Sequence, residues 1–261
     1  MLRSLYTAAT GMDAQQTKLD IIAHNLANTS TTGFKKTRAD FEDLLSETIR
    51  SATAPTAQGG GRPEPLQVGL GVRTATTTRS FSQGDMNSTQ NPLDIAIEGN
   101  GFFRIQRANG EFAYTRAGNF RTDATGRLVT QTGEIVDPGI NIPQDATGVT
   151  VRGDGTVLVT VSGRVEPTEL GNIHLALFTN PGGMESLGNN LLGATAASGE
   201  PLLVKPGEQG AGSLSQGYLE GANVKAVEEM VDMITTQRAY EMNSKVIQTA
   251  DQMLQRLTQL R

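Results

Sequence analysis

The amino-acid sequence predicts an α+β protein in which long N- and C-terminal helices pair as a coiled-coil layer and flank a central antiparallel β domain of short strands. Three observations predict this fold class. Apolar residues recur at heptad spacing near both ends of the chain, and short β-forming runs alternate with turn residues between those ends. Glycine is also abundant, at 30 of 261 residues against a usual share of about 7%, which is typical of many tight turns.

The N-terminal helix is expected over residues 4–28, where it ends in turn-forming residues that lead to Gly33. One seam position repeats every seven residues and a second position is offset from it, which is the pattern of a coiled coil. The N-terminal seam consists of Leu2, Leu5, Ala9, Met12, Gln16, Leu19, Ala23 and Leu26.

The C-terminal helix is expected from Asn223, as its N-cap, to Arg261, because this stretch contains neither proline nor glycine. Glu228 and Glu229 lie in its first two turns, where the positive end of the helix dipole favours carboxylates. Seam residues follow in steps of three and four, with one five-residue step that marks a register shift. The C-terminal seam consists of Val224, Val227, Val231, Ile234, Ala239, Asn243, Val246, Ala250, Met253, Leu257 and Leu260.

These patterns divide the chain into the N-terminal helix and its following segment (1–45), an extended stretch rich in glycine and proline (46–67), the β domain (68–221) and the C-terminal helix (222–261). Within the second segment, residues 51–67 are expected to lack regular structure of their own. Strands are expected at 94–97, 101–105, 112–114, 127–129, 156–161 and 174–178. Asn109-Gly110 and Asp154-Gly155 are expected to form hairpin turns.

Composition excludes several classes of function. Lys and Arg total 22 against 27 for Asp and Glu, without segregation of sign, which disfavours binding to nucleic acid or to an anionic membrane. The absence of cysteine removes disulfides, thiol nucleophiles and cysteine-based metal sites. No stretch is apolar enough to span a bilayer or to form the core of a cleaved signal peptide, so we expect any export to proceed without one.

The motifs that might carry chemistry have simpler interpretations. Gly99-Asn100-Gly101 begins like a dinucleotide fingerprint but is followed by β-forming residues, so we expect a tight turn. Arg152-Gly153-Asp154 spells an adhesion tripeptide, yet it leads directly into a turn. His24 and His174 have no second histidine at metal-ligand spacing. We therefore expect no catalytic, cofactor-binding or metal site.

A short basic run just past the first helix could in principle bind phosphate. Lys35, Lys36 and Arg38 follow Phe34 in the sequence. Because short basic runs next to helices usually face solvent, we expect these side chains to be solvated.

Three groups of motifs resemble the bacterial flagellar basal-body rod and hook family, most closely the members that build the distal rod. The resemblance covers essentially the whole chain. The N-terminal group is Ser4-Leu5-Tyr6-Thr7-Ala8-Ala9-Thr10-Gly11-Met12, Asn25-Leu26-Ala27-Asn28 and Thr32-Gly33-Phe34-Lys35. The central group is Asp94-Ile95-Ala96-Ile97-Glu98-Gly99-Asn100-Gly101-Phe102-Phe103 and Tyr114-Thr115-Arg116-Ala117-Gly118. The C-terminal group is Glu228-Glu229-Met230-Val231-Asp232-Met233-Ile234 and Gln237-Arg238-Ala239-Tyr240-Glu241.

The resemblance implies a structural, non-enzymatic subunit that polymerises through its terminal helices into a rigid hollow drive shaft, which carries motor torque to the hook. It implies a place in the basal-body rod in the periplasm. The implied partners are further copies of the chain, other rod proteins, the hook protein, the envelope ring proteins and the export apparatus, with no nucleic acid, small-molecule substrate or cofactor. A proximal rod protein of similar length is the alternative within the family.

Other interpretations of the sequence remain open. Periodicity alone is equally consistent with an intramolecular antiparallel helix pair packed on the β domain. A secreted adhesin and a polysaccharide hydrolase are alternatives from other classes. If the chain polymerises, we expect residues 51–67 to stiffen the polymer by lying against neighbouring β domains, with Pro55, Pro63 and Pro65 limiting their freedom and Leu66 and Val68 anchoring them.

Overall fold

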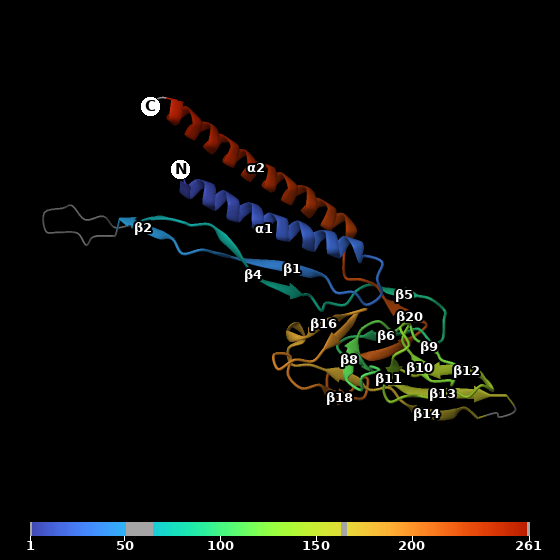
Figure 1. The fold of residues 1–261 in the computed structure, drawn as a ribbon. Helices are drawn as coiled ribbons and strands as arrows, with labels where there is room; N and C mark the ends of the chain where they lie inside the picture. The colour runs from blue at the N-terminus through green and yellow to red at the C-terminus, as the bar shows by residue number, and fades with distance from the viewer. Residues whose placement is uncertain (1, 51–64, 163–165, 260–261) are drawn as a thin grey trace. The chain divides into compact units, whose positions relative to one another are not determined.

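The computed structural model describes residues 2–50, 65–162 and 166–259, which fold into two compact units (Figure 1). The helical unit comprises Met1–Ala27, Thr37–Thr78 and Lys225–Arg261, and the β unit comprises Asn28–Lys36 and Arg79–Val224. The chain therefore passes from one unit to the other four times.

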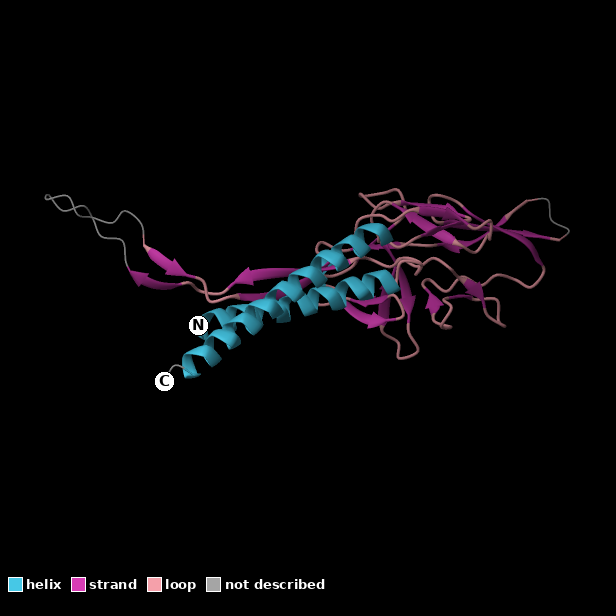
Figure 2. Ribbon diagram, turned by 90° about the horizontal axis from the view of Figure 1, so that it is seen from above, coloured by secondary structure: helices cyan, strands magenta, loops and turns pink. Residues whose placement is uncertain are grey.

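Two long helices dominate the helical unit. Helix α1 spans Leu2–Ala27 and helix α2 spans Ala226–Gln259. They lie side by side and antiparallel, so that α1 begins at the end of the pair where α2 finishes (Figures 1 and 2). Both helices were predicted, and the structure confirms them. The prediction that Asn223 caps the second helix is wrong, because the helix starts at Ala226 and the Asn223 side chain is engaged elsewhere.

Two pairs of strands complete the helical unit. Strand β1, Thr37–Asp43, pairs with β4, Val72–Arg79. Strand β2, Glu47–Arg50, pairs antiparallel with β3, Leu66–Val68. The first residues assigned to the predicted β domain thus fold with the helices, because β4 pairs with β1. The expectation that Leu66 and Gln67 lack regular structure is wrong, since both pair with β2, whereas residues 51–64 lie outside the described residues.

The β unit is built from short strands whose described pairings are antiparallel, as the sequence predicted. The largest sheet has the order β16-β17-β8-β7-β11-β10-β9, with β15 beside β7 and β18 beside β15. A second sheet has the order β12-β13-β14, and β6 pairs with β19 and β5 with β20. The strands are β5 Met86–Ser88, β6 Ile95–Glu98, β7 Phe102–Gln106, β8 Phe112–Thr115, β9 Arg121–Thr122, β10 Leu128–Val129, β11 Ile135–Val136, β12 Ala146–Val151, β13 Thr156–Val161, β14 Thr168–Asn172, β15 Leu175–Leu177, β16 Glu185–Gly188, β17 Leu191–Gly193, β18 Leu202–Val204, β19 Ser213–Gln216 and β20 Tyr218–Glu220.

The core of the β unit is made by residues of these strands and of the segments that connect them. Ile97, Phe103, Ile105, Val159 and Ile173 are completely buried in one cluster. Burial of each such side chain contributes about 1.5–3 kcal/mol. A smaller aromatic cluster lies beside it, in which the Phe102 and Tyr114 rings both meet Phe178 edge to face.

Glycines with positive φ make the predicted turns. Gly110 has φ +83° and Gly155 has φ +88°, a conformation that favours residues without a Cβ. A Cβ on Gly155 would also lie 2.4 Å from the Ile173 carbonyl oxygen. The Arg152-Gly153-Asp154 tripeptide therefore belongs to the turn between β12 and β13, where the Gly155 N–H donates to the Arg152 carbonyl.

Candidate assembly surfaces and a buried ion cluster

One face of α2 packs within the helical unit, and its most deeply buried side chains are small or polar. Glu229, Thr236 and Ala250 are buried on this face. Asn25 of α1 donates from Nδ2 to Glu229 Oε2 over 3.3 Å and to the Thr37 carbonyl over 2.8 Å. A polar side chain of α1 therefore meets a buried carboxylate of α2.

A glycine of α1 opens room for this contact. A Cβ on Gly11 would lie only 3.0 Å from Asn243 Nδ2 of α2. The side chain of any other residue would push against Asn243, so glycine permits the close approach of the two helices.

Helix α2 also carries five large apolar side chains that are exposed. At 3.6 residues per turn, Val227, Val231 and Ile234 lie on the side of the helix away from Thr236, whereas Val246 and Met253 lie four and three residues from Ala250 and therefore flank it. They are exposed to between 45% for Val246 and 73% for Val227. We call these five residues the apolar stripe. A stripe of large apolar side chains that the chain itself does not cover marks an interaction site.

The predicted seams include both exposed and buried residues. The five residues of the stripe all belong to the predicted C-terminal seam, whereas Ala250 is buried and Ala239 is half-buried. On α1, Ala9 is exposed, and Leu5, Met12, Leu19 and Leu26 are half-buried. The side chains of Leu2, Leu257 and Leu260 lie outside the described part of the structure.

A second exposed apolar surface lies on the β2–β3 pair. Leu45 is 88% exposed, and Ile49, Leu66 and Val68 also face solvent. Pro65 is exposed next to them. Pro55 and Pro63, which were expected to restrict this part of the chain, lie outside the described residues.

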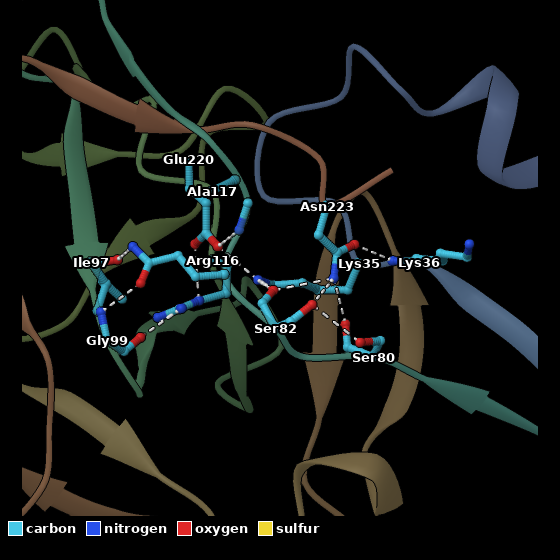
Figure 3. Close-up of polar contacts among 12 residues, drawn as sticks. Lys35, Lys36, Ser80, Ser82, Ile97, Gly99, Arg116, Ala117, Glu220 and Asn223 are labelled. Carbon is cyan, nitrogen blue, oxygen red and sulfur yellow. Dashed lines mark hydrogen bonds and ion pairs between the residues drawn. The ribbon is translucent and has the colours of Figure 1, made fainter. Parts of the chain in front are cut away.

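The β unit contains a buried cluster of three charged side chains (Figure 3). Lys35 Nζ lies 2.7 Å from Glu220 Oε1, and Arg116 Nε lies 3.1 Å from Glu220 Oε2. The side chains of Lys35, Glu220 and Arg116 are 3%, 0% and 5% exposed. The expectation that Lys35 faces solvent is therefore wrong: the chain folds back over it, and Glu220 supplies its counter-charge.

Backbone groups complete the surroundings of the cluster. Lys35 Nζ also donates to the Ser82 carbonyl over 2.7 Å, and the Gly84 N–H donates to Glu220 Oε1 over 3.0 Å. Burial lowers the pKa of Lys35, and the hydrogen bond and charge of Glu220 oppose that shift. Burial likewise lowers the pKa of Arg116, again against the charge of Glu220.

The turn at Gly99-Asn100-Gly101 binds the Arg116 guanidinium. Nη1 of Arg116 donates to the Gly101 carbonyl over 2.8 Å, and Nη2 donates to the Gly99 carbonyl over 2.7 Å. Both glycines have positive φ, and a Cβ on Gly99 would lie 2.9 Å from Gly212 Cα. The glycines that begin like a nucleotide-binding motif thus form a tight turn, as predicted, and its carbonyls hold an arginine.

Asn223 binds two other segments of the β unit next to the cluster (Figure 3). Its Oδ1 accepts a hydrogen bond from the Lys36 N–H over 2.6 Å. Its Nδ2 donates to the carbonyls of Ser80 and Ser82, over 2.9 and 3.2 Å. The side chain therefore uses its acceptor and its donors within the β unit.

The sequence motifs supply most of this cluster, although their individual roles were not foreseen. Lys35 ends the N-terminal group of motifs, and Arg116 lies in the central group. Glu220 and Asn223 stand just before the C-terminal group. The available signal was a charged residue directly after an apolar strand run, as at Arg116 and Glu220, but nothing in the sequence pairs charges that are more than 100 residues apart.

Among the described residues, no three His, Asp or Glu side chains gather closely enough to hold a metal ion. No helix in the described part of the chain is both long and apolar enough to cross a bilayer.

Comparison with known protein families gives three matches in chain order. Residues 5–35 match the flagella basal body rod protein family, and residues 96–159 match the D1 domain of the flagellar hook protein FlgE/F/G family. Residues 215–260 match the C-terminal family of the flagellar basal body rod FlgEFG proteins.

Individual relatives match over the full chain. The chain is 50% identical over 261 residues to the flagellar basal-body rod protein FlgG of Caulobacter vibrioides and 42% identical over 267 residues to FlgG of Bacillus subtilis, with complete coverage of each chain. The flagellar hook protein FlgE of Helicobacter mustelae is 47% identical over 137 residues, which cover 52% of this chain and 30% of the hook protein. These matches confirm the resemblance inferred from the motifs, and the chain belongs to the flagellar basal-body rod and hook protein family, in which its full-length relatives are FlgG rod proteins.

Proposed function

We propose that this chain is a structural subunit of the flagellar distal rod, which polymerises through its terminal helices. The observation that carries the proposal is the apolar stripe of α2, Val227, Val231, Ile234, Val246 and Met253, which the chain leaves exposed. In a polymer, helices of neighbouring copies would cover the stripe. Burial of these apolar side chains would then contribute favourable hydrophobic free energy to assembly.

Repetition of one heterologous contact explains how a single chain could build a shaft. A contact between two different faces of identical subunits generates an open helical filament when the rotation does not close. The stripe on α2 and the exposed or half-buried seam residues of α1 offer two such faces. We propose that the resulting hollow rod lies in the periplasmic part of the basal body and carries torque to the hook.

The proposed partners follow from that location. They are further copies of this chain along the rod, other rod proteins and the hook protein at its ends, and the envelope ring proteins around it. The chain would reach the growing tip through the flagellar export apparatus. No enzymatic step, cofactor, nucleic acid or small-molecule substrate forms part of the proposal.

We further propose that the segment between β2 and β3 stiffens the rod. Leu66 and Val68 are exposed where this segment rejoins the described structure, so they are available to bind a neighbouring copy. Pro55, Pro63 and Pro65 would limit the conformations that the segment can adopt. Contacts repeated on every copy would resist the sliding between neighbours that bending requires.

Electron microscopy of the purified protein and of two variants tests the polymer. The unmodified chain is expected to form tubular polymers. Ile234→Asp places a carboxylate in the stripe and should abolish them, because burying an unpaired charge costs several kcal/mol. Ile234→Val keeps an apolar side chain at the same position, is the matched control and should polymerise normally.

The outcome also separates the proposal from its alternatives. Polymers formed equally well by Ile234→Asp would contradict the role of the stripe. Unmodified protein that stays monomeric while binding cells or cleaving a polysaccharide would favour an adhesin or a hydrolase instead.

A further inference from the structure

Three of the four passages between the two units lie close in sequence to residues that the Asn223 side chain joins. Lys36 is the last residue before the second passage, Ser80 is the second residue after the third, and Asn223 is the next-to-last residue before the fourth. All the contacts described below lie within the β unit.

The Asn223 side chain joins the three segments. Oδ1 accepts from the Lys36 N–H, and Nδ2 donates to the carbonyl oxygens of Ser80 and Ser82. Nδ2 also lies 3.0 Å from Ser82 Oγ. Asn223 belongs to one of the three segments. Its side chain contacts the segment of Lys36 through its acceptor and the segment of Ser80 and Ser82 through its donors.

Backbone hydrogen bonds join the same segments a second time. The Ser80 N–H donates to the Lys36 carbonyl over 2.8 Å, and the Asn223 N–H donates to the Phe34 carbonyl over 3.4 Å. The Gly33 N–H donates to the Glu220 carbonyl over 2.8 Å. Each of these bonds joins two segments that lie far apart in sequence, and together they connect the first segment to both others.

The buried ion cluster fixes the segments from inside the β unit. Lys35 belongs to the first segment and Glu220 to the third, and their charged atoms are 2.7 Å apart. Ser82 of the second segment accepts from Lys35 Nζ, and the Gly84 N–H donates to Glu220. Each segment is therefore attached both at its surface, through Asn223, and in the interior, through the ion pair.

We propose that residues 33–36, 80–84 and 220–223 form a clasp that makes the three passages act as one joint. A single linker rotates freely about its own φ and ψ angles, whereas three linkers that are bound to one another cannot rotate independently. The clasp would thus restrict how the helical unit moves relative to the β unit, without itself belonging to the contact surface of either. Asn223 is the positioning residue of the joint.

This inference concerns the isolated chain and goes beyond the proposed function. If the chain also forms a rod, the clasp would share the load between the helical and β units over three covalent connections. Electron microscopy tests polymerisation and a label distance in the monomer tests the clasp, so either proposal can fail while the other holds.

A pair of spin labels measures the motion directly. The sequence contains no cysteine, so Gln237→Cys in the helical unit and Ser186→Cys in the β unit, both exposed, provide unique labelling sites. The distance distribution between the labels is measured by pulsed electron paramagnetic resonance on full-length, monomeric protein. Asn223→Ala removes the side-chain hydrogen bonds to both other segments and should broaden this distribution.

Two further variants sharpen the test. Asn223→Asp keeps the acceptor for the Lys36 N–H but turns a carboxylate oxygen toward the carbonyls of Ser80 and Ser82, so it should broaden the distribution as well. Asn172→Ala is the matched control, because Asn172 accepts from Thr156 and donates to Glu169 away from the passages. Its distribution should match that of the unmodified chain.

Hydrogen exchange of the β13 amides distinguishes a loosened joint from an unfolded unit. The clasp predicts that these amides stay protected in Asn223→Ala while the label distribution broadens. An unchanged distribution in both Asn223 variants would overturn the proposal. Loss of β13 protection would overturn it too, because Asn223 would then be a determinant of the β fold instead of a joint.

Discussion

The residue that most constrains the β unit is Glu220. Its carboxylate is the counter-charge for both Lys35 and Arg116, and all three side chains are buried. An isolated charge in such surroundings costs several kcal/mol, whereas a paired and hydrogen-bonded one is tolerated. The cluster is therefore stable only as a set.

Glu220→Gln is expected to destabilise the β unit by about 3–5 kcal/mol, because it leaves two buried cations without a counter-charge. Urea unfolding of the unmodified chain and of the variant measures the difference. Glu134→Gln serves as the control, since Glu134 pairs with Arg107 over 3.6 Å in a partly exposed setting and should cost less than about 1 kcal/mol. Equal effects of the two substitutions would mean that Lys35 and Arg116 find other partners.

Asp123 gives the β unit a pH-dependent contribution. A hydrogen bond from the Thr125 hydroxyl, followed by those from the backbone N–H of Arg127, the backbone N–H of Thr125 and the Arg127 side chain, holds the pKa of Asp123 far below its ordinary value of 3.8. Because the folded pKa is lowered, the unfolded chain binds more protons near that value. The stabilisation is thus complete above the unfolded pKa and is lost as the pH falls toward the folded one.

Asp123→Asn should therefore lower the free energy of unfolding near neutral pH by more than it does in acid. Chemical unfolding of both proteins, repeated from about pH 6 down to pH 2, measures the gap between them. A gap that stays constant over this range would show that the charge of Asp123 contributes nothing.

At the scale of the element, α2 carries two sets of side chains with different tasks. The face with Thr236 packs inside the helical unit, where Ile247 and Leu254 are half-buried, whereas the apolar stripe is exposed. The helix thus covers its own unit on one side and keeps further large apolar residues uncovered. Substitutions in the two sets should consequently affect different states of the protein.

Ala250→Leu is expected to destabilise the isolated chain by about 1–3 kcal/mol, because Ala250 is only 2% exposed and the larger side chain overpacks its surroundings. Thermal unfolding followed by helical circular dichroism measures this effect. Ala9→Leu, the same change at an exposed position of α1, should leave the monomer unaffected and impair polymerisation instead. If Ala9→Leu also destabilised the monomer, the assignment of Ala9 to an assembly surface would be wrong.

At the scale of the whole molecule, each unit keeps some of its apolar surface uncovered. The helical unit exposes the stripe of α2 and, on its β2–β3 pair, Ile49, Leu66 and Val68. Such surface is unfavourable in a free chain and becomes favourable only when a partner covers it. The architecture is thus that of a subunit whose energetics are completed by assembly.

Leu66→Ser combined with Val68→Ser should leave assembly intact and yield polymers that are more curved. The physical reason is that the stripe, which drives assembly in our proposal, is untouched, while the apolar anchors of the stiffening segment are lost. Curvature measured in electron micrographs tests this. Gln67→Ser alters the opposite face of the same strand and should give straight polymers; straight polymers from the double variant as well would place the stiffness elsewhere.

The sequence by itself determined the elements that depend on local patterns. Heptad periodicity and the absence of proline specified both long helices, and alternating β-formers specified strands such as Thr156–Val161, whose predicted and observed bounds coincide. Glycines in αL turns could be predicted equally well, because the requirement for positive φ is local. The motif groups also sufficed to identify the family.

Tertiary structure alone decided which surfaces meet. Helical periodicity shows that residues share a face but not what covers that face, so the structure was needed to show that Thr236 and Ala250 are buried and the apolar stripe is exposed. The pairing of Lys35 with Glu220 joins residues 185 positions apart, and Asn223 ties segments more than 140 positions apart. Long-range contacts of this kind depend on how the chain returns to itself, and no periodicity or propensity along the sequence encodes that path.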